Sequence, residues 1–207
     1  MTGSAIPEDT RYAVLSTIVF KKMATAGVVA NATAVDIDTV RAVLDDFESS
    51  GAVFRAEENI LSTEVAEQQV GEYADRQYEA VRSDPAVERW MARFGTQNRH
   101  FLETVSAWQQ IDQGGKKVAN DHTDPAYDAH ILARIDATLV RVGKLIDELS
   151  TKVPRLARYG ERLQEAFDNV DAGDSRYLSD PMVESVHNIW FELHEDILLI
   201  LGKERTE

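Results

Sequence analysis

Apolar residues recur at spacings of three and four positions over most of the chain, which is the period of an amphipathic α-helix. Before residue 62 three such segments follow one another, and two short β-favouring runs then flank Ala56-Glu57-Glu58. The third helical segment begins after Asp36, whose side chain is suited to cap the first turn. The pattern predicts helices at about 9–23, 24–32 and 36–49 and hairpin strands at 52–55 and 59–62.

The remainder of the chain is predicted to be helical, starting with a largely polar linking helix at about 62–82. Three acid–proline pairs then mark helix starts, because an acidic N-cap followed by proline suits the first turn. These pairs are Asp84-Pro85, Asp124-Pro125 and Asp180-Pro181. The expected bundle helices are 85–111, 125–152, 154–170 and 181–201, the last of them apolar on most sides and therefore central.

Two local features refine this picture of the bundle. Asn98 is a polar residue within the apolar seam of its helix, and such a residue is predicted to be buried and to set the packing register. The glycine-containing segment 113–117 is predicted to be an exposed, mobile loop. The sequence thus predicts a mainly α protein with an N-terminal helical module and small β-hairpin at 1–62, a linking helix at 63–84 and an antiparallel helical bundle at 85–207.

The N-terminal module has a recognisable order of elements. Val35-Asp36-Ile37-Asp38-Thr39-Val40-Arg41 opens the third helix, Ser50-Gly51-Ala52-Val53 enters the hairpin, and Leu61-Ser62 closes it. This order resembles the winged helix-turn-helix of bacterial regulators such as the MarR family. The resemblance implies a recognition helix that enters the major groove of DNA, with Arg41 and Arg55 as the DNA-binding side chains.

The charge of the chain argues against this DNA reading. The formal net charge is -14, and protein–DNA affinity depends largely on Lys and Arg contacts to phosphates. Arg41 is surrounded by acidic residues on the third helix, and Arg55 lies close in sequence to Glu57 and Glu58. Two hypotheses follow for this module: a transcriptional-regulator-like protein that senses a small, anionic ligand, and an accessory or docking subunit that uses the module to contact a protein partner. A third hypothesis, a helical-bundle enzyme that uses histidine and carboxylate residues, has no supporting motif in the sequence.

Composition excludes several classes of protein. Without cysteine there is no disulfide framework, thiolate metal site or cysteine nucleophile. We expect no metal and no cofactor, since glycine-rich phosphate loops and metalloprotease motifs do not occur. No apolar run is long enough to cross a bilayer, and the first residues do not resemble a signal peptide, so we expect a cytoplasmic protein without membrane contact.

A candidate ligand pocket lies on the C-terminal helix. His187, Trp190 and His194 fall on one helical face together with Phe191 and Leu198. Histidines between aromatic residues either line a pocket or are hydrogen-bonded within the core. The two histidines are seven residues apart, which is too far for the chelation that histidines one helical turn apart provide.

Other candidate ligand contacts come from the bundle. The polar loop 120–128 carries His122 and Tyr127, which either serve local capping or close over a ligand. Arg158 and Arg162 belong to a basic stripe with Lys152 and Arg155, and this stripe either pairs with neighbouring carboxylates or binds an anion. Asn98, in the seam, is a further candidate.

The bundle also carries sequence segments that are informative together. They are Trp108-Gln109, residues 120–128, residues 158–163 and residues 186–196. These segments resemble a bacterial group of largely uncharacterised proteins that join a winged helix to such a helical domain, and modules that accompany phosphoenolpyruvate-utilising phosphotransferases. The resemblance implies an accessory or regulatory role and carries over no catalytic residues. The helices at 62–82 and 85–111 are long enough to pair in a homodimer.

Overall fold

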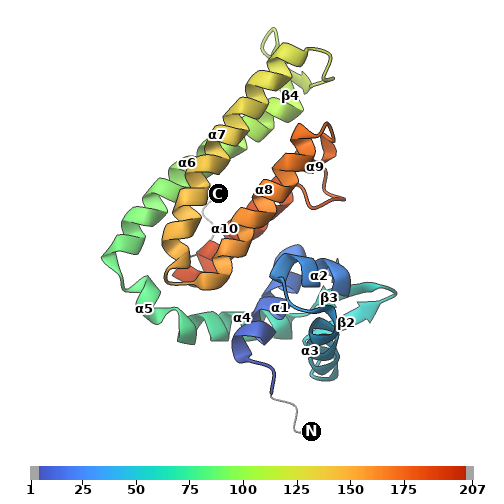
Figure 1. Ribbon diagram of the computed structural model, residues 1–207, viewed down its shortest axis with the longest axis vertical. Helices are drawn as coiled ribbons and strands as arrows, with labels where there is room; N and C mark the ends of the chain where they lie inside the picture. Colours follow the sequence, from blue (N-terminus) through green and yellow to red (C-terminus); the bar gives the residue numbers. More distant parts are fainter. Residues whose placement is uncertain (1–4, 204–207) are drawn as a thin grey trace. The chain divides into compact units, whose positions relative to one another are not determined.

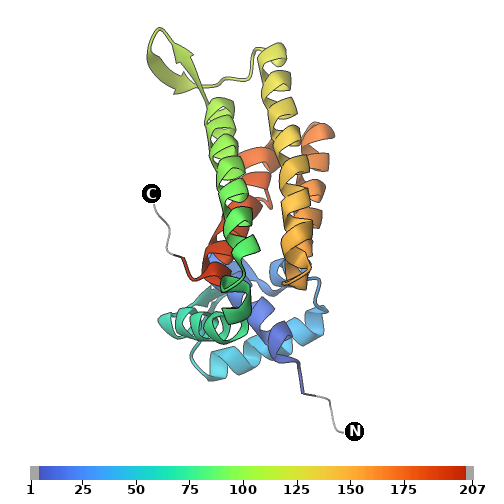
Figure 2. The same cartoon turned by 90° about the vertical axis from the view of Figure 1, so that its left-hand side faces the viewer.

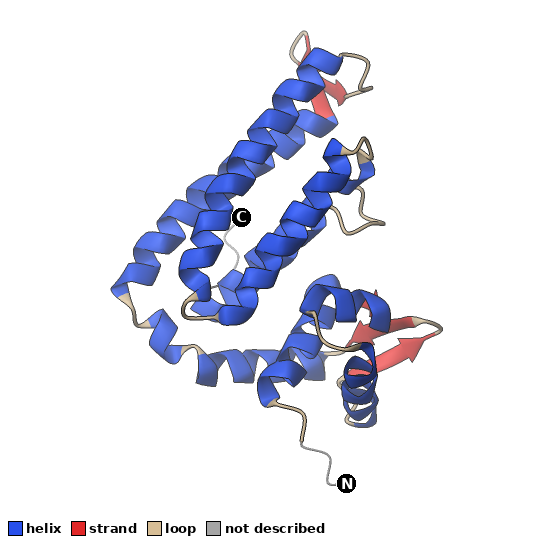
Figure 3. Ribbon diagram, viewed as in Figure 1, coloured by secondary structure: helices blue, strands red, loops and turns tan. Residues whose placement is uncertain are grey.

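The computed structural model describes residues 5–203, and the chain divides into two compact units. One unit holds the chain up to Ser83 and again from Phe191, and the other holds Asp84–Trp190. Helices dominate both units, which confirms the predicted mainly α fold class (Figure 3). The residues from 191 onward, which the helical pattern predicts to be part of the bundle, lie in the same unit as the N-terminal helices.

The N-terminal helices and hairpin form close to their predicted positions (Figure 1). One short strand, β1, was not predicted; it pairs antiparallel with β3, so the sheet has the order β1-β3-β2. Three residues are too few to show the alternation of apolar and polar positions that predicts a strand. This strand forms because it pairs with β3, which is distant in sequence. The elements are α1 (Glu8–Lys21), β1 (Met23–Thr25), α2 (Ala26–Thr33), α3 (Ile37–Ser49), β2 (Val53–Ala56) and β3 (Asn59–Ser62).

The predicted cap and inner face of α3 are confirmed. The Asp36 carboxylate accepts hydrogen bonds from the backbone N–H groups of Asp38 and Thr39 at 3.0 and 3.2 Å. Four apolar side chains at helical spacing are buried on one side of α3, which leaves its charged side exposed. The buried residues are Val40, Val43, Leu44 and Phe47.

The predicted linking helix is wrong in detail, because it is two helices, α4 (Glu64–Gln77) and α5 (Glu79–Arg82). α4 is part of the N-terminal unit: the rings of Tyr12 on α1 and Tyr73 on α4 stack with centroids 4.0 Å apart. The Tyr73 hydroxyl also donates to Asp9 Oδ1 at 2.6 Å. These contacts between α1 and α4 were not evident from a mainly polar sequence.

The second unit contains the long helices. α6 and α7 run side by side, and α8 packs along α7 (Figure 2). The Trp90 indole N–H of α6 donates to the Leu145 carbonyl of α7 at 2.7 Å, which joins the two helices in their buried interior. The elements are α6 (Pro85–Gln109), β4 (Gln110–Gln113), β5 (Lys116–Ala119), α7 (Pro125–Ser150), the 3-10 turn η1 (Pro154–Leu156), α8 (Ala157–Asp171) and α9 (Arg176–Ser179); α10 (Val186–Leu201) follows.

The segment predicted as a mobile loop is the turn of a β-hairpin. β4 and β5 pair antiparallel, with Gln113 opposite Lys116. Gly114 and Gly115 between them have φ angles of 65° and 87°, and glycine adopts such positive values without the steric cost that a side chain imposes. The strand residues are mostly exposed, so the apolar pattern that predicts strands is absent here.

Two of the three predicted acid–proline helix starts are confirmed, and the third is wrong. Asp84 and Asp124 cap α6 and α7. Asp180 instead accepts from the Met182 N–H in a turn, and α10 begins at Val186. The Ser185 hydroxyl accepts from the Asn188 N–H at 3.3 Å, so serine provides the capping contact that we had expected from Asp180.

Aromatic rings fill the centre of the second unit. Trp190 stacks on Phe101 with ring centroids 3.9 Å apart, and Phe94 lies between Trp190 and Trp90 at 6.1 and 5.3 Å. Asn98 is half-buried rather than buried as predicted, and its Oδ1 accepts the hydrogen bond of the buried Trp190 indole N–H. Within residues 5–203, the helices lack the combination of length and apolar character that crossing a bilayer requires.

Candidate functional site

The surface of α3 and the β2–β3 hairpin is the first candidate site. Its exposed carboxylates define what we call the acidic face. Arg41 donates to Asp38 Oδ1 at 3.1 Å, and the Arg55 guanidinium donates to both Asp45 and Glu48. Both arginines that the sequence assigned to DNA are therefore ion-paired with α3 itself. The acidic face comprises Asp36, Asp38, Asp45, Asp46, Glu48, Glu57 and Glu58.

The electrostatics of Arg55 follow from this pairing. Its hydrogen bond to Asp45 is the main reason that the pKa of the Arg55 guanidinium is raised above its ordinary value, and Glu48 adds to the effect. A further arginine, Arg11 of α1, donates to Asp46 Oδ2 at 2.7 Å and lies over the Phe47 ring. The acidic face thus holds its neighbouring arginines in place.

A cavity of about 290 Å³ lies beside this face, between α1, α3 and α4. Tyr12, Phe47 and Tyr73 contribute aromatic walls, while Arg11 and Arg76 lie among the charged lining residues. Arg76 donates to Glu8 Oε1 at 2.7 Å, so both arginines already have carboxylate partners. None of the residues predicted to bind a ligand lines this cavity.

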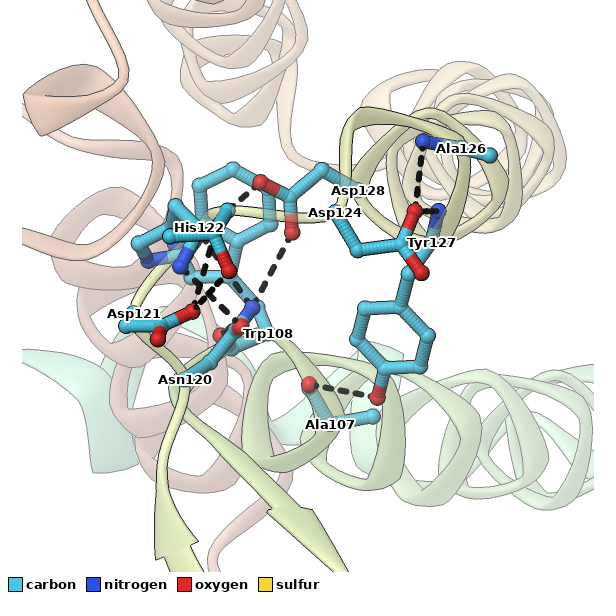
Figure 4. Close-up of polar contacts among 10 residues, drawn as sticks. Ala107, Trp108, Asn120, Asp121, His122, Asp124, Ala126, Tyr127 and Asp128 are labelled. Atoms are coloured by element: carbon cyan, nitrogen blue, oxygen red, sulfur yellow. Dashed lines mark hydrogen bonds and ion pairs between the residues drawn. The ribbon is translucent and has the colours of Figure 1, made fainter.

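The second candidate site lies where the β4–β5 hairpin returns to α7 (Figure 4). The Asn120 amide donates to the Trp108 carbonyl and to Asp128 Oδ1, both at 3.0 Å. His122 Nδ1 lies 3.0 Å from Asp128 Oδ2, and its ring lies against the Trp108 ring with centroids 4.3 Å apart. His122 Nδ1 also lies 3.2 Å from Asn120 Nδ2, so the carboxylate and the amide both contact this ring nitrogen.

The backbone of this site is held in an uncommon conformation. His122 has a φ angle of 57°, in the left-handed region that non-glycine residues seldom adopt. Its own N–H donates to Asn120 Oδ1 at 3.2 Å, and Asp128 holds its ring. Such a conformation persists when surrounding contacts determine it, which is what Asn120 and Asp128 provide here.

Tyr127, the other predicted residue of this loop, has a structural contact. Its hydroxyl donates to the Ala107 carbonyl at 2.9 Å, joining the first turn of α7 to the end of α6 (Figure 4). Asp124 caps α7 by accepting from the Ala126 and Tyr127 N–H groups. The site therefore fastens the hairpin to α7 and presents a half-exposed imidazole whose orientation Asp128 determines.

The predicted pocket on α10 is divided between the two units. His187 and Trp190 belong to the second unit and His194 belongs to the first. The Trp190 indole N–H donates to Asn98 Oδ1 at 2.8 Å, so these two predicted residues do meet. His187 is half-buried near the Phe101 ring, and burial lowers the pKa of its imidazole below the ordinary value.

The predicted basic stripe is engaged in ion pairs within the second unit. Arg158 donates to Glu161 and Glu165 at 2.8 and 3.1 Å. Arg162 is buried and donates to Glu184 Oε2 at 2.6 Å. An anionic ligand that binds this stripe would therefore have to displace these carboxylates from the arginines.

The sequence predicts His122 and Tyr127 as ligand contacts, but it does not indicate the roles of Asn120, Asp128 or the Trp108 carbonyl. The available signal was the density of short polar side chains before α7, which predicts capping but does not specify which groups meet. Trp108 precedes β4 and His122 follows β5, so the pairing of the two strands brings these residues together.

Among the described residues, no group of three or more His, Cys, Asp or Glu side chains is arranged to hold a metal ion. Comparisons of the chain with protein-family models, with curated proteins and with solved structures find no match.

Proposed function

We propose that this protein is an accessory or docking subunit whose N-terminal module binds a protein partner through the acidic face. One observation carries the proposal: Arg41 and Arg55, the arginines placed to contact DNA, are both paired with carboxylates of the acidic face. Contact with phosphates would require these ion pairs to break while the surrounding carboxylates repel the DNA backbone.

Charge across the module supports a basic partner. Between residues 36 and 62 there are seven Asp or Glu residues and two Lys or Arg residues. A surface of this sign attracts Lys- and Arg-bearing protein surfaces and speeds their association. The expected partner is a metabolic enzyme, in line with the resemblance to modules that accompany phosphotransferases.

Sequence-specific DNA binding is the second candidate function. It is favoured by the order of elements, in which helices α1, α2 and α3 precede the β2–β3 hairpin and β1 completes the sheet. In this alternative, a small-ligand signal would have to favour one conformation over another in order to regulate DNA binding.

Fluorescence anisotropy of fragmented genomic DNA, titrated at two salt concentrations, separates the two functions. The docking proposal expects no saturable binding, even at low salt. Sequence-selective binding that weakens with salt and disappears in Arg55→Ala would contradict the docking proposal and support a regulator.

Partner capture from the native cells provides the complementary experiment. The wild-type chain is compared with a variant carrying Asp45→Lys and Glu48→Lys, and with a variant carrying Glu103→Lys and Asp136→Lys, which is the charge-matched control at exposed positions of α6 and α7. The proposal expects a stoichiometric protein partner that the wild type and the control retain and the acidic-face variant loses. Equal retention by all three chains would contradict it.

A further inference from the structure

One face of the three-stranded sheet carries a row of apolar side chains. Met23 of β1 and Phe54 of β2 are both direct cross-strand partners of Leu61 of β3, so the three residues lie in one row on the same face. We call these three residues the apolar row. The adjacent residues Ala24 and Ile60 are buried, which places the core on the opposite face of the sheet.

The apolar row is unusually exposed. Met23 retains 53% of its accessible surface and Phe54 retains 48%, while Leu61 between them is half-buried. Neighbouring strands lie about 4.8 Å apart, so the three side chains form a continuous strip about 10 Å across. Methionine and aromatic side chains are enriched at protein interfaces, and a contiguous exposed apolar strip is typical of a contact surface.

The charges around the row indicate what kind of surface covers it. The turn that joins β2 to β3 consists of Glu57 and Glu58, both exposed. Arg55 lies on the opposite face of the sheet, as alternation requires, and pairs with α3 carboxylates. Its positive charge is therefore committed to α3, and the turn beside the row is acidic. A second copy of this chain would bring the same acidic turn to the contact.

We propose that the apolar row is the contact surface for a protein partner that presents apolar side chains flanked by lysine or arginine. The partner's apolar residues pack against Met23, Leu61 and Phe54, and its cations face Glu57 and Glu58. The inference rests on the proposed docking function; it adds to the acidic face an apolar contact beside Glu57 and Glu58, and it specifies the chemistry of the partner. Apolar contact provides affinity, and charge selects the partner and its orientation.

Selection of a random peptide display library on the immobilised full chain tests the chemistry. Enriched peptides are expected to combine apolar residues with Lys or Arg. The tightest enriched peptide is then titrated into chain labelled with ¹³C at the methionine methyl groups. Met23 is expected to shift, whereas Met182, which is exposed in the other unit, serves as the unperturbed reference.

Two serine variants test the surface itself. Phe54→Ser is expected to weaken binding of the peptide about tenfold or more, since central apolar contacts dominate interface affinity. Leu102→Ser, which removes another exposed apolar side chain on α6, is the matched control and is expected to bind as the wild type does. Circular dichroism checks that both variants remain folded.

Several results would overturn the inference. They are enrichment of acidic or purely polar peptides, no enrichment, an unmoved Met23 signal, and equal affinity of Phe54→Ser and wild type. A Met23 shift that depends on protein concentration without peptide would identify a second copy as the occupant. If Asp45→Lys with Glu48→Lys abolishes peptide binding and Phe54→Ser does not, the docking function stands and the apolar row is not its contact surface. Selective DNA binding would instead contradict the docking function.

Discussion

Lys21 Nζ lies 2.6 Å from Glu192 Oε1, and this ion pair joins α1 to α10 across 171 positions of sequence. The lysine and glutamate side chains are only 8% and 6% exposed. A charge removed from water so fully is tolerated when a partner of opposite sign is in contact with it. The pair therefore helps to explain why the chain from Phe191 onward belongs to the same unit as the N-terminal helices.

Removing one partner of this pair is expected to destabilise the protein strongly. Lys21→Met leaves the Glu192 carboxylate buried beside an apolar side chain, and the expected loss is about 3–5 kcal/mol in the free energy of unfolding. The measurement is urea unfolding followed by circular dichroism. The double variant Lys21→Met with Glu192→Leu is the control and is expected to recover part of the loss, because neither charge remains buried. A Lys21→Met chain as stable as the wild type would contradict the prediction.

The hydrogen bond between Trp190 and Asn98 provides a second test. Asn98→Leu removes the acceptor of a buried indole N–H, and an unsatisfied buried donor costs about 1–3 kcal/mol. We therefore expect a lower urea midpoint for Asn98→Leu, whereas Asn98→Asp retains a side-chain oxygen and serves as the control. If Asn98→Leu is as stable as the wild type, the bond does not contribute to the packing of this aromatic layer.

His187 is expected to make stability depend on pH. Burial lowers the pKa of its imidazole below the ordinary value of 6.5, so the unfolded chain binds a proton more readily than the folded chain. This contribution to stability is complete above pH 6.5 and decreases as the pH falls below it. Thermal unfolding between pH 5 and pH 8 measures the effect.

The control for this pH dependence is a second histidine variant. His187→Gln is expected to flatten the decrease in melting temperature at acidic pH, while His130→Gln, at an exposed position on α7, is expected to retain the wild-type profile. The same acidic decrease in wild type and His187→Gln would assign the effect to other groups.

Asp128 is expected to hold the loop that precedes α7. Asp128→Ala removes the carboxylate that contacts His122 Nδ1 and accepts from the Asn120 amide, and His122 then has fewer contacts to maintain its left-handed backbone. Amide hydrogen exchange is expected to accelerate in the β4–β5 hairpin and at the start of α7. Asp136→Ala, on an exposed position of α7, is the control, and equal exchange in the two variants would show that the network does not fasten the hairpin.

Local interactions explain which parts of the fold the sequence predicted. Asp36 caps α3 and Asp124 caps α7 because a carboxylate reaches N–H groups two or three residues away, and such contacts depend on neighbours in sequence. Helical periodicity likewise indicated the buried side of α3. These features determined the mainly α fold class and most helix boundaries.

The sites depend on contacts that sequence neighbours do not determine. The pairing of β1 with β3 creates the row that contains Met23 and Leu61, and ion pairs to α3 commit Arg55 to the protein itself. The sequence alone determined that this is an acidic, helical chain without cysteine. Only the tertiary structure decided which charges are paired and which apolar residues remain exposed, because both depend on atoms brought together from distant positions by packing and strand pairing.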